Sequence, residues 1–243
     1  MKDILQDIVA HTHTLGLPMV KVSVSDANDT VIESMAEDRS VIVTAKTHTP
    51  VAEFNNTFGM PNLDKLSLHL KNPEYRENEK IEVITDVRNG DTIPTHIHFE
   101  NSSGDFHNDY RFMSKAIIEE KLKAVKFKGA TWVIVFEPTL ASISRLKLMS
   151  AAHSEEPLFR VSTSNNNLVF SFGDANTHAG EFIFEANVSG QLQHTWSYPV
   201  AQVQSILNLD GDVTMSISDQ GAMKITVDSG MTTYDYIIPA QSK

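Results

Sequence analysis

The histidines of this sequence have a spacing that could support metal chemistry. His96 and His98 are separated by one residue, and a second pair with the same spacing occurs near the N-terminus. On a β-strand, residues i and i+2 share a face, so two such histidines can ligate one metal ion. With Glu100 or His107 nearby, His96 and His98 could form the metal centre of an oxygenase or hydrolase. The sequence has no third ligand at a recognisable spacing, so exposed strand histidines are the simpler interpretation and a metal-dependent enzyme is the alternative.

Other signatures of catalysis are absent from the sequence. It contains no GxSxG, GxxxxGK[ST] or HExxH motif, and it contains no cysteine. Disulfide bonds and thiolate metal sites are therefore excluded. We expect a protein that is not an enzyme and that needs no cofactor and no metal. A structural β-rich virion protein is a further alternative, because it would share the fold class without needing cationic helices.

Composition and charge limit the class of protein. The chain has 243 residues, enough for two modest domains, with 41% hydrophobic and 21% charged residues. It has no apolar run near the roughly 20 residues that cross a membrane, and its first five residues lack the apolar length of a signal peptide. We therefore expect a cytoplasmic protein without membrane contact. The net charge of −11 argues against a surface that binds nucleic acid as a whole, so any DNA contact must come from a separate basic face.

Two pairs of matching segments indicate an internal duplication. The stretch PMVKVSVSDANDTVIE begins at Pro18, and PLFRVSTSNNNLVFSFGD begins at Pro157, 139 residues later. Both alternate apolar and polar side chains around a cluster of Asn or Asp, which predicts a β-hairpin. A second match, TFGMP from Thr57 and TWSYP from Thr195, recurs at a spacing of 138 residues. Two matches at nearly one spacing indicate two copies of one fold.

Each copy combines short helices with many strands. Helices are expected at residues 2–13, 61–70, 139–151 and 199–207, and further strands at residues 40–47, 80–87, 96–100, 106–113, 131–136, 181–187, 213–218, 223–227 and 233–238. Two short helices on one face of antiparallel sheets let both layers bury apolar side chains, so we expect an α+β fold. The predicted domains are residues 1–113 and 130–243, joined by a connector at residues 114–129.

Positive charge is concentrated in two segments of the chain. The connector is rich in lysine, with Lys115, Lys121, Lys123, Lys126 and Lys128. The helix expected at residues 139–151 carries Arg145 and Lys147 and no acidic residue. These two segments are the candidates for a cationic face.

Four segments, taken in their order along the chain, carry a resemblance to a known family. They are Leu63–Leu70, Phe99–Glu100 followed by Asp109–Met113, Leu140–Met149 and Tyr236–Ala240. In this order, and with the duplication, they resemble the DNA polymerase sliding clamps. The similarity covers essentially the whole chain; the clamps of tailed phages are the nearest type, and proliferating cell nuclear antigen (PCNA) is a more distant relative.

The resemblance implies a processivity factor without catalytic activity of its own. Two-domain subunits of this family close as a homotrimer, a ring of six domains whose helices line a central hole and whose sheets lie outside. Such a ring encloses double-stranded DNA independently of sequence and has the DNA polymerase and a clamp loader as partners. The compartment would be the cytoplasm, that of the host cell if the protein is phage-encoded.

The resemblance also implies three sets of site residues. Residues expected to face the DNA are Lys65, Lys71, Lys121, Lys123, Arg145 and Lys147. A pocket for a short apolar peptide tail of the polymerase or clamp loader is expected at Ile117, Ile118, Tyr236, Ile237, Ile238, Pro239 and Ala240. Subunits are expected to join strand to strand through residues 106–113 and 181–187, with Phe106, Tyr110, Phe112, Phe182 and Phe184 at the contact.

Overall fold

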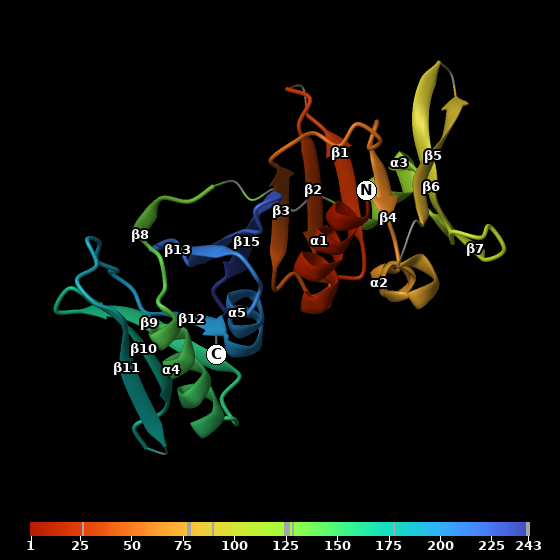
Figure 1. Ribbon diagram of the computed structural model, residues 1–243. Coiled ribbons are helices and arrows are strands. Elements are labelled where there is room, and N and C mark those ends of the chain that lie inside the picture. Colours follow the sequence, from red (N-terminus) through yellow and green to blue (C-terminus); the bar gives the residue numbers. More distant parts are fainter. Residues whose placement is uncertain are drawn as a thin grey trace. The chain divides into compact units, whose positions relative to one another are not determined.

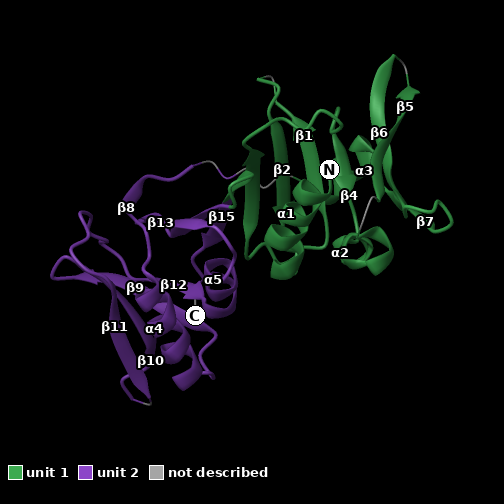
Figure 2. Cartoon of the chain, in the orientation of Figure 1, with its two compact units in different colours: residues 1–125, 229–234 green, residues 126–228, 235–243 purple. Residues whose placement is uncertain are grey.

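The chain forms two compact units. The structure, a computed structural model, describes residues 1–25, 27–76, 79–88, 90–123, 127, 129–176 and 178–241. Unit 1 comprises residues 1–125 and 229–234, and unit 2 comprises residues 126–228 and 235–243 (Figure 2). Within the described residues, no helix combines the length and the apolar composition needed to cross a membrane.

The described residues of unit 1 form two antiparallel sheets and three α-helices (Figure 1). Its elements are α1 (Lys2–Thr12), η1 (His13–Leu15), β1 (Val20–Val24), β2 (Thr30–Met35), β3 (Ile42–Thr47), β4 (Phe58–Met60), α2 (Leu63–Lys71), η2 (Pro73–Tyr75), β5 (Lys80–Arg88), β6 (Asp91–Glu100), β7 (His107–Arg111) and α3 (Lys115–Lys121). The strand order of the first sheet is β4-β1-β2-β3, followed by the start of β15, and that of the second is β5-β6-β7.

Unit 2 repeats this plan. Its elements are β8 (Trp132–Phe136), α4 (Leu140–Ala152), β9 (Leu158–Ser164), β10 (Asn167–Gly173), β11 (Ala179–Glu185), β12 (Trp196–Pro199), α5 (Val200–Leu207), β13 (Asp212–Ser218), β14 (Ala222–Asp228) and the end of β15 (Thr232–Pro239). The strand orders are β12-β9-β10-β11 and β8-β13-β14 followed by β15.

The duplication predicted from the sequence is confirmed by the topology. The orders β4-β1-β2-β3 and β12-β9-β10-β11 are the same arrangement of four consecutive strands. Val22 of β1 lies between Ile32 and Phe58, and its equivalent Val161 lies between Phe170 and Trp196. In each copy, the central strand of the hairpin therefore keeps the same two neighbours.

Alternating burial explains how each sheet meets its helices. Along β2, every second residue is buried, since successive side chains of a strand point to opposite faces. On α1, Leu5 and Ile8 are fully buried, and α1 packs beside α2. The equivalent helices α4 and α5 pack together in unit 2. Apolar side chains from a helix pair and from one sheet face thus share one core in each unit.

Four elements differ from the sequence prediction. The strands β4 and β12 were not predicted, because three or four residues are too few to reveal an alternation. Strand β6 extends over Asp91–Glu100 and is longer than predicted. The helix α3 lies inside the segment predicted to be a connector, where Ile118 is its one buried residue. The proposed domain limits at residues 113 and 130 stay a prediction.

A buried carboxylate joins α1 to the first residues of β15 in unit 1. The Tyr234 hydroxyl donates a hydrogen bond to Asp7 Oδ2 at 2.8 Å, and His11 Nδ1 lies 3.2 Å from Asp7 Oδ1. The His11 ring stacks on the Tyr234 ring at a centroid distance of 4.5 Å. Burial acts to raise the pKa of Asp7, but hydrogen bonds from His11, Tyr234 and Ser229 outweigh it and lower that pKa.

Replacing Tyr234→Phe should lower the free energy of unfolding by about 1.5–3 kcal/mol at pH 7, because a buried carboxylate loses a hydrogen-bond donor. The pKa of Asp7 is lower in the folded state than in the unfolded state. The stability contributed by its carboxylate is therefore complete above the unfolded-state pKa of about 3.9 and is lost as the pH falls through the lower folded-state pKa. The difference between wild type and variant, measured by chemical denaturation, should therefore shrink below about pH 4.

Tyr198→Phe is the matched control. Tyr198 is also fully buried, but its hydroxyl has no hydrogen-bond partner among the described residues. Its replacement should leave the free energy of unfolding unchanged or raise it by up to about 1 kcal/mol. Equal losses for the two variants would show that the Asp7 hydrogen bond contributes nothing specific.

Candidate functional site

Helix α2 buries one side and exposes the other. Leu63, Leu66 and Leu70 recur at intervals of three or four residues and are buried. Lys65 and Lys71, predicted to face DNA, lie on the exposed side. The helical period that builds the core of unit 1 therefore also positions these two cations at the surface.

Helix α4 shows the same division in unit 2. The Thr139 hydroxyl caps its N-terminus by accepting a hydrogen bond from the Ser142 N–H at 3.1 Å. Leu146 is fully buried, whereas Arg145 and Lys147 are exposed. All four cations predicted on these two helices are thus accessible to a ligand.

The charge on the exposed helix surfaces differs in sign from that of the whole chain. None of the four cations of α2 and α4 forms an ion pair with another described residue, whereas Lys2 of α1 pairs with Glu79 at 2.6 Å. On the exposed sides of α1, α2, α4 and α5, the acidic residues are Asp3 and Asp64. Four cations against two carboxylates make these surfaces mildly positive, although the chain carries a net charge of −11.

Exposed leucines accompany these cations, which the sequence analysis did not predict. Leu68 of α2 is 69% exposed, and Leu140 and Leu148 of α4 are 84% and 71% exposed. The signal for Leu148 was present in the sequence, since it lies four residues beyond Ser144 on the polar side of the helix. A leucine offers no donor to a phosphate, so these surfaces present only a few separated charges to an anion.

Two of the predicted DNA-facing residues, Lys121 and Lys123, lie at α3, whereas the others lie on α2 and α4. Lys121 ends α3 and Lys123 follows it, and both are exposed. Ile118 of α3 is fully buried against β4, where a Cβ on Gly59 would approach its side chain to 2.7 Å. Ile117, next to it, is 46% exposed. The lysines Lys126 and Lys128 lie outside the described residues.

The rest of the predicted peptide pocket lies in unit 2. Its residues are Tyr236, Ile237, Ile238, Pro239 and Ala240. The first three are buried in the core, Pro239 is exposed and Ala240 is partly exposed. The Ala240 N–H donates to the Gly221 carbonyl at 2.8 Å, and the Gln241 N–H donates to the Ser197 carbonyl at 2.9 Å. Accessible atoms of the predicted pocket are therefore those of Ile117, Pro239 and Ala240.

The predicted subunit contacts lie at two sheet edges. In their sheets, β7 has β6 as its neighbour and β11 has β10, so each strand has one side without a strand neighbour in the described chain. Tyr110 is buried and donates a hydrogen bond to the Pro61 carbonyl. Phe184 is buried and stacks on Phe170 at a centroid distance of 4.1 Å. These two side chains belong to the cores of their own units.

The other three predicted contact residues are more accessible. Phe106 is exposed beside Tyr75, with a centroid distance of 5.7 Å. Phe112 is partly exposed and packs on Phe58, and Phe182 is partly exposed on β11. Apolar side chains with accessible atoms thus accompany both sheet edges.

The histidine pair on β6 is engaged with carboxylates. His98 Nδ1 lies 2.8 Å from Asp109 Oδ1, and His98 Nε2 lies 3.2 Å from Glu100 Oε2. The hydrogen bond to Asp109, with smaller help from Glu100, raises the pKa of His98, whereas burial lowers the pKa of His96. Among the described residues, no group of three His, Cys, Asp or Glu side chains has an arrangement that could hold a metal ion.

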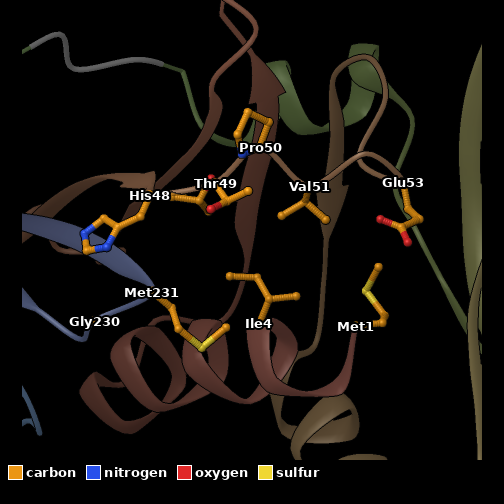
Figure 3. Close-up of a pocket in the computed structure, with 10 residues that line it drawn as sticks. Met1, Ile4, His48, Thr49, Pro50, Val51, Glu53, Gly230 and Met231 are labelled. Carbon is orange, nitrogen blue, oxygen red and sulfur yellow. The ribbon is translucent and has the colours of Figure 1, made fainter.

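A cavity of about 340 Å³ lies in unit 1 (Figure 3). Ile4 of α1, Val51 after β3 and Met231 before β15 line it, with His48 and Glu53 as polar residues. None of the residues predicted for DNA, peptide or subunit contact lines this cavity.

Solved structures with the same fold show which family the architecture resembles. No protein-family model and no curated protein matches the sequence. PCNA from A. fulgidus, bound to the C-terminal region of FEN-1, matches with a TM-score of 0.67 and 10% identity, over 100% of this chain and 95% of that chain. PCNA from Thermococcus kodakaraensis matches with a TM-score of 0.66 and 11% identity, over 99% and 97% of the two chains.

A third match widens the range of organisms. Proliferating cellular nuclear antigen from Entamoeba histolytica matches with a TM-score of 0.64 and 15% identity, over 99% of this chain and 94% of that chain. Identities this low establish the fold alone. The predicted fold class, α+β with two tandem clamp-type domains, is confirmed.

Gly59→Ala should destabilise the packing of α3. The added Cβ would approach the buried Ile118 side chain to 2.7 Å, which is too close for unstrained packing, so a loss of roughly 1–3 kcal/mol in the free energy of unfolding is expected. Limited proteolysis should cut the segment after Met113 faster in this variant. In the double variant Gly59→Ala with Ile118→Ala, the methyl group at position 59 fills part of the space left by the Ile118 side chain. The loss in the free energy of unfolding should therefore be smaller than the sum of the losses in the two single variants. Losses that simply add would contradict a contact between positions 59 and 118.

Proposed function

We propose, on the premise of this shared fold, that the chain is a DNA polymerase sliding clamp. Copies of it would close into a homotrimeric ring around double-stranded DNA and tether the polymerase for processive synthesis. The observation that carries the proposal is the duplicated topology. Within the described residues, β7 of unit 1 and β11 of unit 2 each have one side without a strand neighbour, and a head-to-tail join needs one edge of each kind.

The internal topology supplies the geometry of this join. In unit 1, β3 has the start of β15 as its neighbour, and the His48 N–H donates to the Met231 carbonyl at 2.8 Å where the two segments meet. By the duplication, β11 is the equivalent of β3, and β7 is the equivalent of β15. Pairing β7 of one copy with β11 of the next would repeat the β3–β15 arrangement and satisfy both edges. Such a contact is heterologous, because two different surfaces meet. It gives a closed ring when a whole number of equal rotations from one copy to the next completes a full turn.

The exposed cations of α2 and α4 support a DNA contact. Lys65, Lys71, Arg145 and Lys147 have no competing carboxylate partner among the described residues, so they are available to phosphates. Charges more than about 8 Å away are strongly screened at physiological salt, so acidic groups elsewhere would weaken this contact little. A weakly positive surface suits a ring that stays on DNA by enclosing it, because strong phosphate binding would resist sliding.

The FEN-1 complex of the A. fulgidus protein supports a peptide partner for this chain. We propose that Ile117, Pro239 and Ala240 contact an apolar peptide tail of the polymerase or clamp loader. Resemblance to the tailed-phage type, and with it the cytoplasm of a host cell, rests on the sequence motifs and stays a prediction.

The mass of the particle in solution tests ring formation. Light scattering should give a mass near three times the 27.0 kDa of one chain. A particle that remains a single chain over the whole accessible concentration range would contradict the proposal. A particle of two chains would contradict the homotrimer equally, although a head-to-tail join can also close with two copies.

The charge-reversal variant Arg145→Glu with Lys147→Glu tests the DNA contact. It should reduce stimulation of the cognate polymerase on primed circular DNA by roughly tenfold, because each ring would present six repelling charges to the phosphates. Its light-scattering mass should equal that of the wild type. Lys80→Glu with Arg88→Glu changes the same net charge on exposed residues of β5 and should retain the stimulation. Equal losses in both variants would show that the effect comes from overall charge.

A further inference from the structure

The outer edge of β5 is a place where the two copies of the fold differ. In unit 2, β13 follows α5 and lies between β8 and β14. In unit 1, the equivalent strand β5 follows α2 and has β6 as its one neighbour among the described strands. Strand β8 directly precedes α4, whereas no described strand precedes α1. The duplicated fold therefore has a strand position that is filled in unit 2 and open in unit 1.

The turns after β6 and β14 fix the register of this comparison. The backbone N–H groups of Asn101 and Ser229 each donate a hydrogen bond that closes the turn following these strands. Val83 of β5 and Met215 of β13 each lie opposite the residue four positions before that donor. Val83 and Met215 are therefore equivalent, and so are Thr85 and Ile217, two residues further along.

Side chains at the open edge are less buried than their equivalents in unit 2. Met215 and Ile217 pair in register with residues of β8 and are fully buried. Val83 is partly exposed, and Thr85 is exposed. A strand on this edge would cover Val83 and pair with backbone N–H and C=O groups that lack a strand partner.

The cavity in unit 1 lies where the end of such a strand would arrive. In unit 2, Phe136 ends β8 and packs on Phe184 of β11 with a centroid distance of 5.9 Å, just before α4 begins. Ala45 and Phe182 lie opposite equivalent residues of β2 and β10, so the equivalent of Phe184 is Thr47, two residues after Ala45. Thr47 and the first turn of α1 line the cavity. A smaller side chain and the open strand position therefore leave space at this point.

This cavity can hold an aromatic side chain with a cation beside it. Its volume is about 340 Å³, whereas a cavity of about 150 Å³ is enough for a benzene ring. Figure 3 shows Ile4 and Val51 turned toward each other, with Met231 beside Ile4. Glu53 lies at one end near Met1; it is exposed and forms no ion pair with another described residue. A basic group next to the aromatic side chain would complement this carboxylate.

The charges of β5 itself are balanced. Lys80 Nζ lies 3.3 Å from Glu82 Oε2, and Arg88 Nε lies 3.0 Å from Asp86 Oδ2. Strand β8, which fills the equivalent position in unit 2, contains no charged residue. The edge of β5 is therefore suited to an uncharged, apolar strand.

We propose that the β5 edge and this cavity together bind an extended peptide of another protein. The peptide pairs with β5 as β8 pairs with β13, places an aromatic side chain in the cavity and follows it with a basic residue that contacts Glu53. This partner is distinct from the peptide tail proposed for the surface at Ile117 and Pro239. The site is complete within unit 1, so the inference does not depend on ring formation.

Binding of a labelled peptide to the full chain tests this inference. The probe is fluorescein-labelled TWVIVFKK, which copies residues 131–136 and adds two lysines, and its dissociation constant is measured by fluorescence anisotropy. TWVPVFKK should bind at least roughly tenfold more weakly than TWVIVFKK, because proline cannot donate to a strand ladder. The variant Val83→Lys, which places a charge on the inward side of the edge, should weaken binding of TWVIVFKK by at least roughly tenfold. Far-UV circular dichroism checks that the variant is folded.

Exchanging the charge at the cavity tests the role of Glu53. Glu53→Lys should weaken binding of TWVIVFKK roughly two- to fivefold and strengthen binding of TWVIVFEE by a similar factor. Structural damage alone would not strengthen the second peptide. Glu37→Lys is the matched control: Glu37 is exposed in the turn before β3, at the other end of that strand from Thr47, so this variant should bind both peptides as the wild type does.

Three outcomes overturn the inference. They are no binding of TWVIVFKK to the wild type, equal binding of TWVIVFKK and TWVPVFKK, and wild-type affinity in the folded Val83→Lys variant. If a second copy of the chain filled the edge instead, adding TWVIVFKK would lower the light-scattering mass of the assembled particle, and this result would also overturn it. The mass without peptide tests the ring proposal separately.

Discussion

Backbone hydrogen bonding at strand edges is the constraint on which the rest of this structure depends. A strand edge presents N–H and C=O groups that favour another strand, and proteins either block such edges or use them. Among the strands that the structure describes, β3 has the start of β15 as its neighbour, whereas its equivalent β11 has none on that side. One copy of the repeated join is therefore made within the chain. In the proposed ring, β7 and β11 would be the two halves of a second copy of this join, made between subunits.

The distribution of charge follows from the same architecture. Each helix must bury an apolar stripe against its sheet, so its polar residues are confined to the opposite side. On α2 and α4 this side carries lysine and arginine without acidic partners, while acidic residues lie on strands such as β11 and on α3. A chain with a net charge of −11 can thereby contain a mildly positive surface. Leu68 and Leu148 dilute that surface further, which favours loose electrostatic contact over tight binding.

Much of the fold could be predicted from the sequence, because the duplicated hairpins have strong two-residue periodicity and Asn-rich turns. The equivalence of Val22 and Val161 and the amphipathic pattern of α2 were visible in the residues alone. The short strands β4 and β12 were not, and α3 has one buried residue and so lacks a recognisable apolar stripe. Sequence reasoning also treated Ile118 and Ile238 as surface residues of a pocket. Their burial depends on close packing, such as that against Gly59, which no pattern in a single sequence reveals.

The strand β15 begins in unit 1 and ends in unit 2, and this has a consequence for biosynthesis. Asp7 is synthesised long before Tyr234, whose hydroxyl donates the hydrogen bond to it. A carboxylate without that donor is costly to enclose in a core. The core around Asp7 therefore lacks this hydrogen-bond donor until Tyr234 has been synthesised. A nascent chain that ended before Tyr234 would expose an incompletely closed core to the quality-control machinery of the cell.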